Sequence, residues 1–300
     1  MAIRGTRGDD SLHGTAGDDT FFLGRGGADT AIGGRGGDVF RMGGALDDGD
    51  RIDGGRGRDV VVLEGDYGTQ EYWLDDEFSG VEVLRIIDAD GAVRFDAKDG
   101  LVAAGAVLTV DASAFTGSGQ GLGWYGHDEH DGRFRVIGGS GFDLLEGGDL
   151  ADTLKGGDGD DYLEGGDGAD RLVGGAGNDL FAWGRVEESL GLGHDRIVGL
   201  DLSEDRFFLP DGGSVPDIES GVFGELSAGS FIADLERQVG ATALGLDGAL
   251  IFTASSGDLK GHSYLIVNLH SAAGYEGAHD LIVEITGYQG TLDPGDFYQI

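Results

Sequence analysis

Five tandem nonapeptides restrict the fold of this 300-residue chain more than any other feature of its sequence. Residues 138–182 read GGSGFDLLE, GGDLADTLK, GGDGDDYLE, GGDGADRLV and GGAGNDLFA, without an insertion. Each repeat starts with glycine, carries aspartate at its sixth position and has an apolar residue at its eighth. A short fixed period of this kind is typical of a solenoid, in which every repeat is one small structural unit.

A looser block of the same pattern lies near the N-terminus. Four repeats begin at Gly5, Gly14, Gly24 and Gly33, with the single extra residue Leu23 between the second and the third. A degenerate pair follows, ALDDGDRID and GGRGRDVVV. The sixth-position aspartates of this block are Asp10, Asp19, Asp29, Asp38, Asp50 and Asp59.

The repeat predicts its own geometry. Glycine permits the positive φ angles of a tight turn, and the residues after each turn suit a very short strand with one buried face. Two nonapeptides then close one coil, so the turns of repeats n and n + 2 stack. In the second block this stacking predicts three aspartate pairs: Asp143 with Asp161, Asp152 with Asp170, and Asp161 with Asp179.

Stacked carboxylates need a positive partner between them. At about 4 Å two such charges repel by roughly 1–4 kcal/mol, depending on the local dielectric. The repeat positions offer carboxylate and carbonyl oxygens and no His or Cys. Oxygen ligands in flexible geometry suit Ca²⁺ better than Mg²⁺.

The repeats resemble the nonapeptides of the RTX family (repeats-in-toxin, hemolysin-type calcium-binding proteins), whose pattern is GGxGxDxUx. The resemblance implies a right-handed parallel β-roll with Ca²⁺ between stacked turns, and export by a type I secretion system. In that family the sixth-position aspartate binds through its side chain and the turn glycines offer carbonyls. Carried to the second block, the implied ligands are Asp143, Asp152, Asp161, Asp170 and Asp179, with turn positions Gly139, Gly141, Gly148, Gly157, Gly159, Gly166 and Gly168.

The first block departs from the family pattern. Thr6, Thr15 and Arg25 replace the second glycine of its first three repeats. The resemblance still implies sites there, pairing Asp10 with Asp29 and Asp19 with Asp38, and Asp59 is included as a further ligand. The opposite reading, Gly- and Asp-rich turns without metal, stays open, and more so for this block than for the second.

Residues 60–137 contain less glycine and more β-branched alternation. The segments 60–63, 81–87, 107–110 and 134–137 are predicted strands, separated by turn signals. We expect the solenoid to continue here with longer coils, as a spacer between the two repeat blocks.

Residues 185–300 predict a small α+β domain. Residues 194–201 resemble a short motif that closes many RTX rolls, and 204–209 fit a strand. Residues 227–239 carry apolar side chains at helical spacing, and strands are predicted at 249–253, 264–267 and 281–285. The order of these elements and the apolar tail 297–300 resemble the C-terminal bluetail domains of bacterial RTX surface proteins, although the loop 268–271 lacks their Asp- and Gly-rich character. The tail is read as a secretion signal or as part of a domain that caps the roll.

Charge and composition exclude several classes of protein. With 56 acidic and 20 basic residues the formal net charge is −36, which argues against binding to nucleic acid or to anionic membranes. Cysteine is absent, so disulfides and thiol catalysis are excluded. No apolar run is long enough to span a membrane, and the first residues have no apolar region of a cleavable signal peptide.

Two segments contain residue patterns that resemble a metal-binding motif and a dinucleotide-binding motif. His127-Asp128-Glu129-His130 gathers metal-binding residue types but lacks the HExxH spacing, so we expect a solvated loop. Residues 121–126 match GxGxxG by letter, yet no helical pattern follows them. No catalytic motif is apparent, and an enzyme is not expected.

The sequence therefore predicts an all-β chain, a parallel β-roll with a small α+β C-terminal capping domain. Its predicted parts are a first repeat block (1–63), a β-rich spacer (64–137), a second repeat block (138–184) and a capping or secretion domain (185–300). The predicted function is a secreted Ca²⁺-binding protein that folds outside the cell and acts at a surface or in a matrix, where a polysaccharide is a candidate partner. The alternative is a non-catalytic secretion and folding module of an extracellular hydrolase or epimerase. Export without a cleaved N-terminal signal peptide is expected, to the medium or the cell surface.

Overall fold

The computed structural model describes the chain except residues 48, 66, 68–70, 76, 88–90, 118, 211–214, 216, 240–243, 246–247, 270–273, 278 and 299–300. Two compact units are present: residues 1–150 with 154–159, and residues 151–153 with 160–300. The boundary between the units falls inside the second repeat block. The division into four parts made from the sequence stays a prediction.

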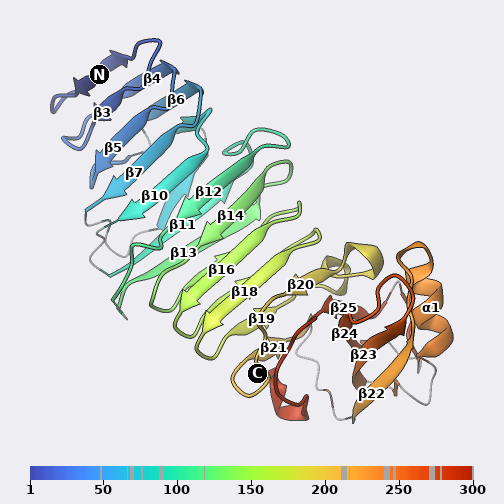
Figure 1. The fold of residues 1–300 in the computed structure, drawn as a ribbon. Helices are drawn as coiled ribbons and strands as arrows, with labels where there is room; N and C mark the ends of the chain where they lie inside the picture. The colour runs from blue at the N-terminus through green and yellow to red at the C-terminus, as the bar shows by residue number, and fades with distance from the viewer. Residues whose placement is uncertain are drawn as a thin grey trace. The chain divides into compact units, whose positions relative to one another are not determined.

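Three sheets, each built from parallel strand pairs, form the first unit (Figure 1). The longest runs, in spatial order, through β1 (Ala2–Arg4), β3 (Thr20–Phe22), β5 (Val39–Gly43), β7 (Val60–Glu64), β10 (Val83–Ile87), β12 (Val107–Asp111), β14 (Arg133–Ile137) and β16 (Thr153–Asp158), of which residues 154–158 belong to this unit. A second contains β2 (Ser11–His13), β4 (Thr30–Arg35), β6 (Arg51–Arg56) and β9 (Phe78–Ser79). The third contains β8 (Glu71–Leu74), β11 (Ala92–Lys98), β13 (Gly121–Asp128) and β15 (Leu144–Glu146).

Register keeps one apolar column in the middle of the longest sheet. Each strand places a residue directly beside its counterpart one coil later, in the order Ile3, Phe21, Phe40, Val61, Leu84, Val110 and Val136. From Phe21 onward every member of this column is fully buried. The coils thus continue through residues 60–137, which confirms the predicted extension of the solenoid and its four predicted strands.

The second unit contains one group of parallel strands and one mixed sheet. One group consists of β17 (Tyr162–Glu164), β19 (Leu180–Ala182), β21 (Arg206–Phe208) and β26 (Phe297–Tyr298), all parallel. The other runs through β18 (Arg171–Ala176), β20 (Asp195–Ile197), β25 (Leu281–Glu284), β24 (Ser263–Val267), β23 (Gly248–Ser256) and β22 (Asp217–Glu225). Strand β24 is antiparallel to both of its neighbours. The three strands predicted after residue 248 are confirmed.

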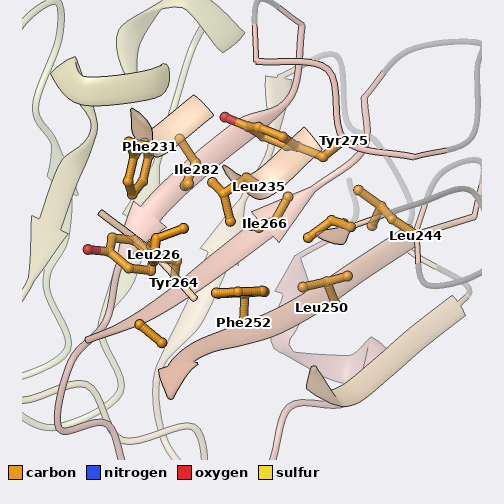
Figure 2. Packing of buried hydrophobic residues seen from close by; sticks show 12 residues of the cluster. Leu226, Phe231, Leu235, Leu244, Leu250, Phe252, Tyr264, Ile266, Tyr275 and Ile282 are labelled. Carbon is orange, nitrogen blue, oxygen red and sulfur yellow. The ribbon is translucent and has the colours of Figure 1, made fainter. Parts of the chain in front are cut away.

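Helix α1 (Phe231–Gln238) packs on the mixed sheet of the second unit. Figure 2 shows Phe231 and Leu235 beside Phe252, Tyr264 and Ile282, in one buried cluster. The helix is shorter than the predicted segment 227–239, because Ala228–Ser230 form a 3₁₀ turn (η4) before it. Other 3₁₀ turns are η1 (Val186–Glu188), η2 (Gly191–Gly193) and η5 (Pro294–Asp296). In the described part of the chain no helix has the length and apolar character to cross a membrane.

The apolar eighth position of each repeat forms the core of the second block. Leu145, Leu154, Leu163, Leu172 and Phe181 are at most 1% exposed. Full burial of a side chain of this size is worth about 1.5–3 kcal/mol. Each coil therefore brings its own small core, and the sixth-position aspartate lies two residues before it.

Candidate metal centre

The sixth-position aspartates of the first unit form two ladders along the stacked turns. In each ladder the backbone amide of one aspartate donates to a carboxylate oxygen one coil later. One ladder joins Asp10 to Asp29 and Asp29 to Asp50, both at 3.0 Å. The other joins Asp19, Asp38, Asp59 and the carboxylate of Glu82, with distances of 2.8, 2.7 and 2.7 Å. The structure stacks Asp10 on Asp29 and Asp19 on Asp38, as the sequence predicted.

The second unit repeats the arrangement. The amide of Asp152 donates to Asp170 at 2.7 Å, and that of Asp170 to Asp195 at 2.9 Å. A parallel ladder joins Asp161 to Asp179 at 3.0 Å and Asp179 to Asp205 at 3.1 Å. Two of the three predicted pairs of the second block are therefore present. The third, Asp143 with Asp161, would join the two units and stays a prediction.

Asp143 lies in the first unit, where two backbone amides donate to its carboxylate. Its Oδ1 accepts a hydrogen bond from the amide of Leu122 at 2.6 Å, and its Oδ2 accepts one from the amide of Gly139 at 2.7 Å. Both carboxylate oxygens of Asp143 therefore already have backbone donors.

Burial makes the charged form of many of these aspartates costly, whereas hydrogen bonds from the N-terminal amine and from the Thr15 amide lower the pKa of Asp19. All of the ladder aspartates except Asp10 are at most 5% exposed. Loss of hydration raises the pKa of Asp29, Asp38, Asp59, Asp143 and Asp205 above the ordinary value. It raises the pKa of Asp179 to about 6. The pKa of Asp170 is raised most strongly by burial and then by the neighbouring charge of Asp195. A cation beside them would reverse this cost, since an opposite charge favours the ionised carboxylate.

Several ladder aspartates keep one carboxylate oxygen without a hydrogen bond. Within the described residues, the Oδ2 atoms of Asp29, Asp38, Asp59, Asp170 and Asp179 are buried and have no hydrogen-bond partner. Buried polar atoms almost always find a partner. An unpartnered, buried oxygen that repeats from coil to coil fits a ligand that is held between the turns.

In several turns, oxygen atoms lie so close to the first residue that it must be glycine. A Cβ at Gly174 would lie 2.0 Å from Asp179 Oδ2, and one at Gly165 would lie 2.3 Å from Asp170 Oδ2. A Cβ at Gly33 would lie 2.3 Å from Asp38 Oδ2 and 2.6 Å from the carbonyl oxygen of Gly54. Carboxylate and carbonyl oxygens without nitrogen or sulfur ligands are the set that Ca²⁺ prefers. The residues present therefore fit the predicted ion.

The turns differ in backbone conformation. Positive φ occurs at the second and fourth positions of five turns, at Gly34 and Gly36, Gly55 and Gly57, Gly157 and Gly159, Gly166 and Gly168, and Gly175 and Gly177. The predicted turn positions Gly139, Gly141 and Gly148 do not have positive φ. Of the predicted turn glycines, the four from Gly157 to Gly168 thus share one turn shape and the other three do not. The ligand role of all these residues stays a prediction.

Sequence reasoning missed three ladder residues, Asp195, Asp205 and Glu82, and it identified Asp50 as a sixth-position aspartate without assigning it to a metal site. Asp195 and Asp205 end the ladders of the second unit, and Asp50 and Glu82 end those of the first. A sequence signal was available for each. An acidic residue is followed two positions later by a buried apolar one, as in Asp195-Arg196-Ile197, Asp205-Arg206-Phe207, Asp50-Arg51-Ile52 and Glu82-Val83-Leu84.

Asp195 is held by more than its ladder partner. Its Oδ2 accepts a hydrogen bond from Trp183 Nε1 at 2.7 Å, and its amide donates to Ser189 Oγ at 2.7 Å. Ser189 in turn donates to the carbonyl of Ile282 at 2.6 Å. The end of this ladder is thereby tied to strand β25 of the mixed sheet.

The segment 127–130 is not a solvated loop as a whole, and that prediction is wrong. His127 and Asp128 belong to strand β13, and the side chain of Glu129 is fully buried. Glu129 accepts hydrogen bonds from the amides of Gly132 at 2.8 Å and Val102 at 3.2 Å, so the protein itself saturates its charge. Lys98 neutralises the neighbouring acids, with Nζ 2.9 Å from Asp96 and 2.7 Å from Asp128.

Residues 121–126, which match GxGxxG by letter, lie in strand β13 and do not form a loop that leads into a helix. Of the loop 268–271, His270 and Ser271 lie outside the described residues, as do Gln299 and Ile300 of the tail.

One family model matches the chain. It is that of the RTX calcium-binding nonapeptide repeat, which matches in four copies over residues 2–26 and 146–181. No curated protein matches the sequence significantly.

Proposed function

Because the chain carries RTX nonapeptide repeats, which bind Ca²⁺, we propose that it is a secreted protein whose two units complete their folding when Ca²⁺ enters the stacked turns outside the cell. The proposal extends to a structural or binding role at a cell surface or in an extracellular matrix. The repeat is typically a structural calcium-binding module, which supports a role without catalysis.

The observation that carries the proposal is the pair of unpartnered Oδ2 atoms on Asp170 and Asp179. Both carboxylates are 1% exposed and neither forms an ion pair among the described residues. Removing a charge from water without a partner costs several kcal/mol. Without a compensating cation, the ionised form of these aspartates destabilises the closed turns.

The net charge of the chain also favours folding only after Ca²⁺ has bound. A formal charge of −36 opposes compaction of the metal-free chain. Extracellular modules bind Ca²⁺ with dissociation constants of roughly 10⁻⁴ to 10⁻³ M. Sites of that affinity stay empty in the cytoplasm and fill outside the cell, so that binding free energy becomes folding free energy. Each site stabilises by about 1.4 kcal/mol when free Ca²⁺ is about 10 times its dissociation constant.

The experiment is a titration of metal-depleted protein with Ca²⁺, followed by far-UV circular dichroism, with Mg²⁺ as the control. We expect a cooperative gain of β-sheet signal between sub-millimolar and millimolar Ca²⁺ and none with Mg²⁺. If the full β-sheet signal is present without metal and Ca²⁺ does not change it, the apolar cores are sufficient for folding. The proposal would then be wrong.

Localisation tests the finer part of the proposal. Cells that produce the protein are separated into cytoplasm, surface and medium, with and without a chelator in the wash. A surface role predicts protein on intact cells that the chelator releases. Protein confined to the cytoplasm would contradict secretion.

A further inference from the structure

Positive charge is concentrated near the N-terminal end of this acidic chain. Residues 1–58 contain 8 arginines and 10 aspartates, whereas the other residues contain 12 basic and 46 acidic ones. Half of those aspartates belong to the buried ladders, namely Asp10, Asp19, Asp29, Asp38 and Asp50. The arginines outnumber the aspartates that remain. This stretch is therefore net basic once its ladder carboxylates are neutralised.

Two of these arginines flank an aromatic ring on the longest sheet of the first unit, at the end where β3 and β5 lie side by side (Figure 1). Arg4 and Phe22 are register partners, and so are Phe22 and Arg41. The guanidinium carbon of Arg4 lies 4.3 Å from the centroid of the Phe22 ring. Such a cation–π contact positions the guanidinium group without using its N–H donors.

A pocket of about 230 Å³ lies beside this row. Its lining includes Arg4, Arg25 and Arg41, together with Phe22 and Glu64. Arg41 is already paired, since its Nε donates to Glu64 Oε1 at 3.1 Å and its Nη2 contacts Glu64 Oε2. The charges of Arg41 and Glu64 therefore cancel, and the pocket keeps the positive charge of the other two arginines.

Arg25 joins this pocket to a second one, which it lines together with Thr6 and Arg7. Arg25 stands where the repeat pattern has its second glycine. Among the described residues, none of Arg4, Arg7 and Arg25 forms an ion pair. Three exposed guanidinium groups without a carboxylate partner thus line two adjoining pockets, in a chain with more than twice as many acidic as basic residues.

Guanidinium groups recognise oxyanions, because their planar fork of N–H donors matches a carboxylate or a phosphate in bidentate geometry. Duplex DNA carries one charge per about 1.7 Å of its axis, and the acidic remainder of the chain would repel it. A polymer of carboxylated sugars carries at most one charge per sugar, which suits a small group of arginines. Its hydroxyl groups can donate to the carboxylate of Glu64.

We infer that the two pockets joined by Arg25 bind an acidic polysaccharide through its carboxylates, with Arg4, Arg7 and Arg25 as the anion-binding residues. The inference rests on the proposed extracellular role and names the chemistry of the partner. It also gives the arginine at the second position of the third repeat a use that glycine could not serve.

The test measures the binding of a galacturonate trisaccharide to full-length, Ca²⁺-loaded protein by isothermal titration calorimetry. We expect binding that weakens as salt is added, because exposed charges are screened, and no binding of the neutral sugar maltotriose. Arg25→Gln and Arg4→Gln should each weaken binding about tenfold, the scale of one hydrogen bond to a charged group. Arg56→Gln is the matched control and should bind like the wild type, because Arg56 is exposed, lies in β6 and loses the same charge.

Several results would overturn the inference. One is the absence of galacturonate binding to the folded protein, and another is an equal loss of affinity in Arg56→Gln and Arg25→Gln. A short DNA duplex that binds more tightly than galacturonate, and does so through Arg25, would assign the arginines to nucleic acid. Sedimentation that shows self-association of the wild type but not of Arg25→Gln would assign them to a second copy of the chain.

The inference and the proposed function fail separately. Full β-sheet signal without Ca²⁺ in the circular dichroism titration would remove calcium-dependent folding and leave arginine-dependent binding of galacturonate intact. Calcium-dependent folding without any binding of galacturonate would leave the proposed folding mechanism intact and remove this site.

Discussion

At the scale of a residue, Asp170 shows how one side chain links three coils. Its Oδ1 accepts from the amide of Asp152, its own amide donates to Asp195, and its Oδ2 stays without a hydrogen bond. Asparagine could preserve the first two contacts while removing the charge. The substitution therefore separates the structural use of the carboxylate from its electrostatic use.

We expect Asp170→Asn to have opposite effects with and without metal. In metal-depleted protein it should raise the melting temperature or leave it unchanged, because a buried carboxylate is removed. In Ca²⁺ it should raise the calcium midpoint about tenfold, which corresponds to about 1.4 kcal/mol. Tryptophan fluorescence during Ca²⁺ titration measures the midpoint, with the exposed Asp158→Asn as a control of equal charge. An equal shift of the midpoint in both variants would mean that only net charge matters.

Asp161 and Asp143 should differ in the same assay. Asp161 is predicted to serve two sites, while both oxygens of Asp143 already accept backbone hydrogen bonds. Asp161→Asn should therefore raise the calcium midpoint more than Asp143→Asn. Equal midpoints for the two variants would count against stacked sites.

At the scale of an element, the turn is where sequence reasoning reaches its limit. The period of the repeat was enough to predict the coils, the buried leucines and the aspartate ladders. The second glycines Gly139 and Gly157 look alike in sequence, yet only Gly157 has a positive φ, and the amide of Gly139 binds Asp143 instead. Glycine accepts both conformations at little cost, so the neighbouring coil decides which one forms.

The ends of the ladders were missed for a different reason. From Asp170 to Asp195 the separation is 25 residues, and from Asp179 to Asp205 it is 26, against 18 within the tandem repeats. The longer connection breaks the nine-residue period, although each of these aspartates is still followed two positions later by a buried apolar residue. At Glu82 the residue type changes as well, so only the buried apolar residue two positions later, Leu84, indicated it.

A methyl group at the first position of a turn should disrupt both the turn and its metal site. Gly174→Ala would place Cβ 2.0 Å from Asp179 Oδ2, and overpacking of this kind costs about 1–3 kcal/mol. We expect a lower melting temperature and a higher calcium midpoint. Gly193→Ala is the control, because a Cβ there meets nothing within 4 Å. Similar losses in both variants would point to backbone effects instead.

Helix α1 covers the mixed sheet of the second unit through apolar contacts. Leu235 is fully buried among Phe231, Phe252 and Ile266. Leu235→Ala should therefore cost about 2–5 kcal/mol in the free energy of unfolding, measured by urea denaturation in saturating Ca²⁺. The number of bound ions should stay unchanged. Loss of bound Ca²⁺ in the folded variant would show that the helix and the ladders are coupled.

At the scale of the whole molecule, protons and calcium compete for the same charges. Burial raises the pKa of Asp179 to about 6, from an ordinary value near 3.8. A raised pKa means that the folded state holds the proton more tightly than the unfolded state, so its stabilisation is complete below the ordinary value and is lost as pH rises through about 6. The growing negative charge of the chain acts in the same direction.

Metal-depleted protein should therefore melt at a higher temperature at pH 5 than at pH 7, a window that stays clear of the sequence pI near 4.1. Saturating Ca²⁺ should reduce this difference, because a bound cation favours the ionised carboxylates. Thermal melts followed by circular dichroism measure both series. A melting temperature that rises from pH 5 to pH 7 without metal would contradict the burial of unpaired carboxylates.

The ladders also have a direction. Within each unit the amide of an earlier aspartate always donates to the carboxylate of a later one, from Asp19 to Asp38 to Asp59 and from Asp152 to Asp170 to Asp195. Each of these aspartate amides therefore needs a carboxylate acceptor from a later segment of the chain. A chain that left a narrow channel with its N-terminus first would always expose one unfinished turn. A chain that emerged with its C-terminus first would present each new coil to a finished template, with Asp195 and Asp205 as its starting edge.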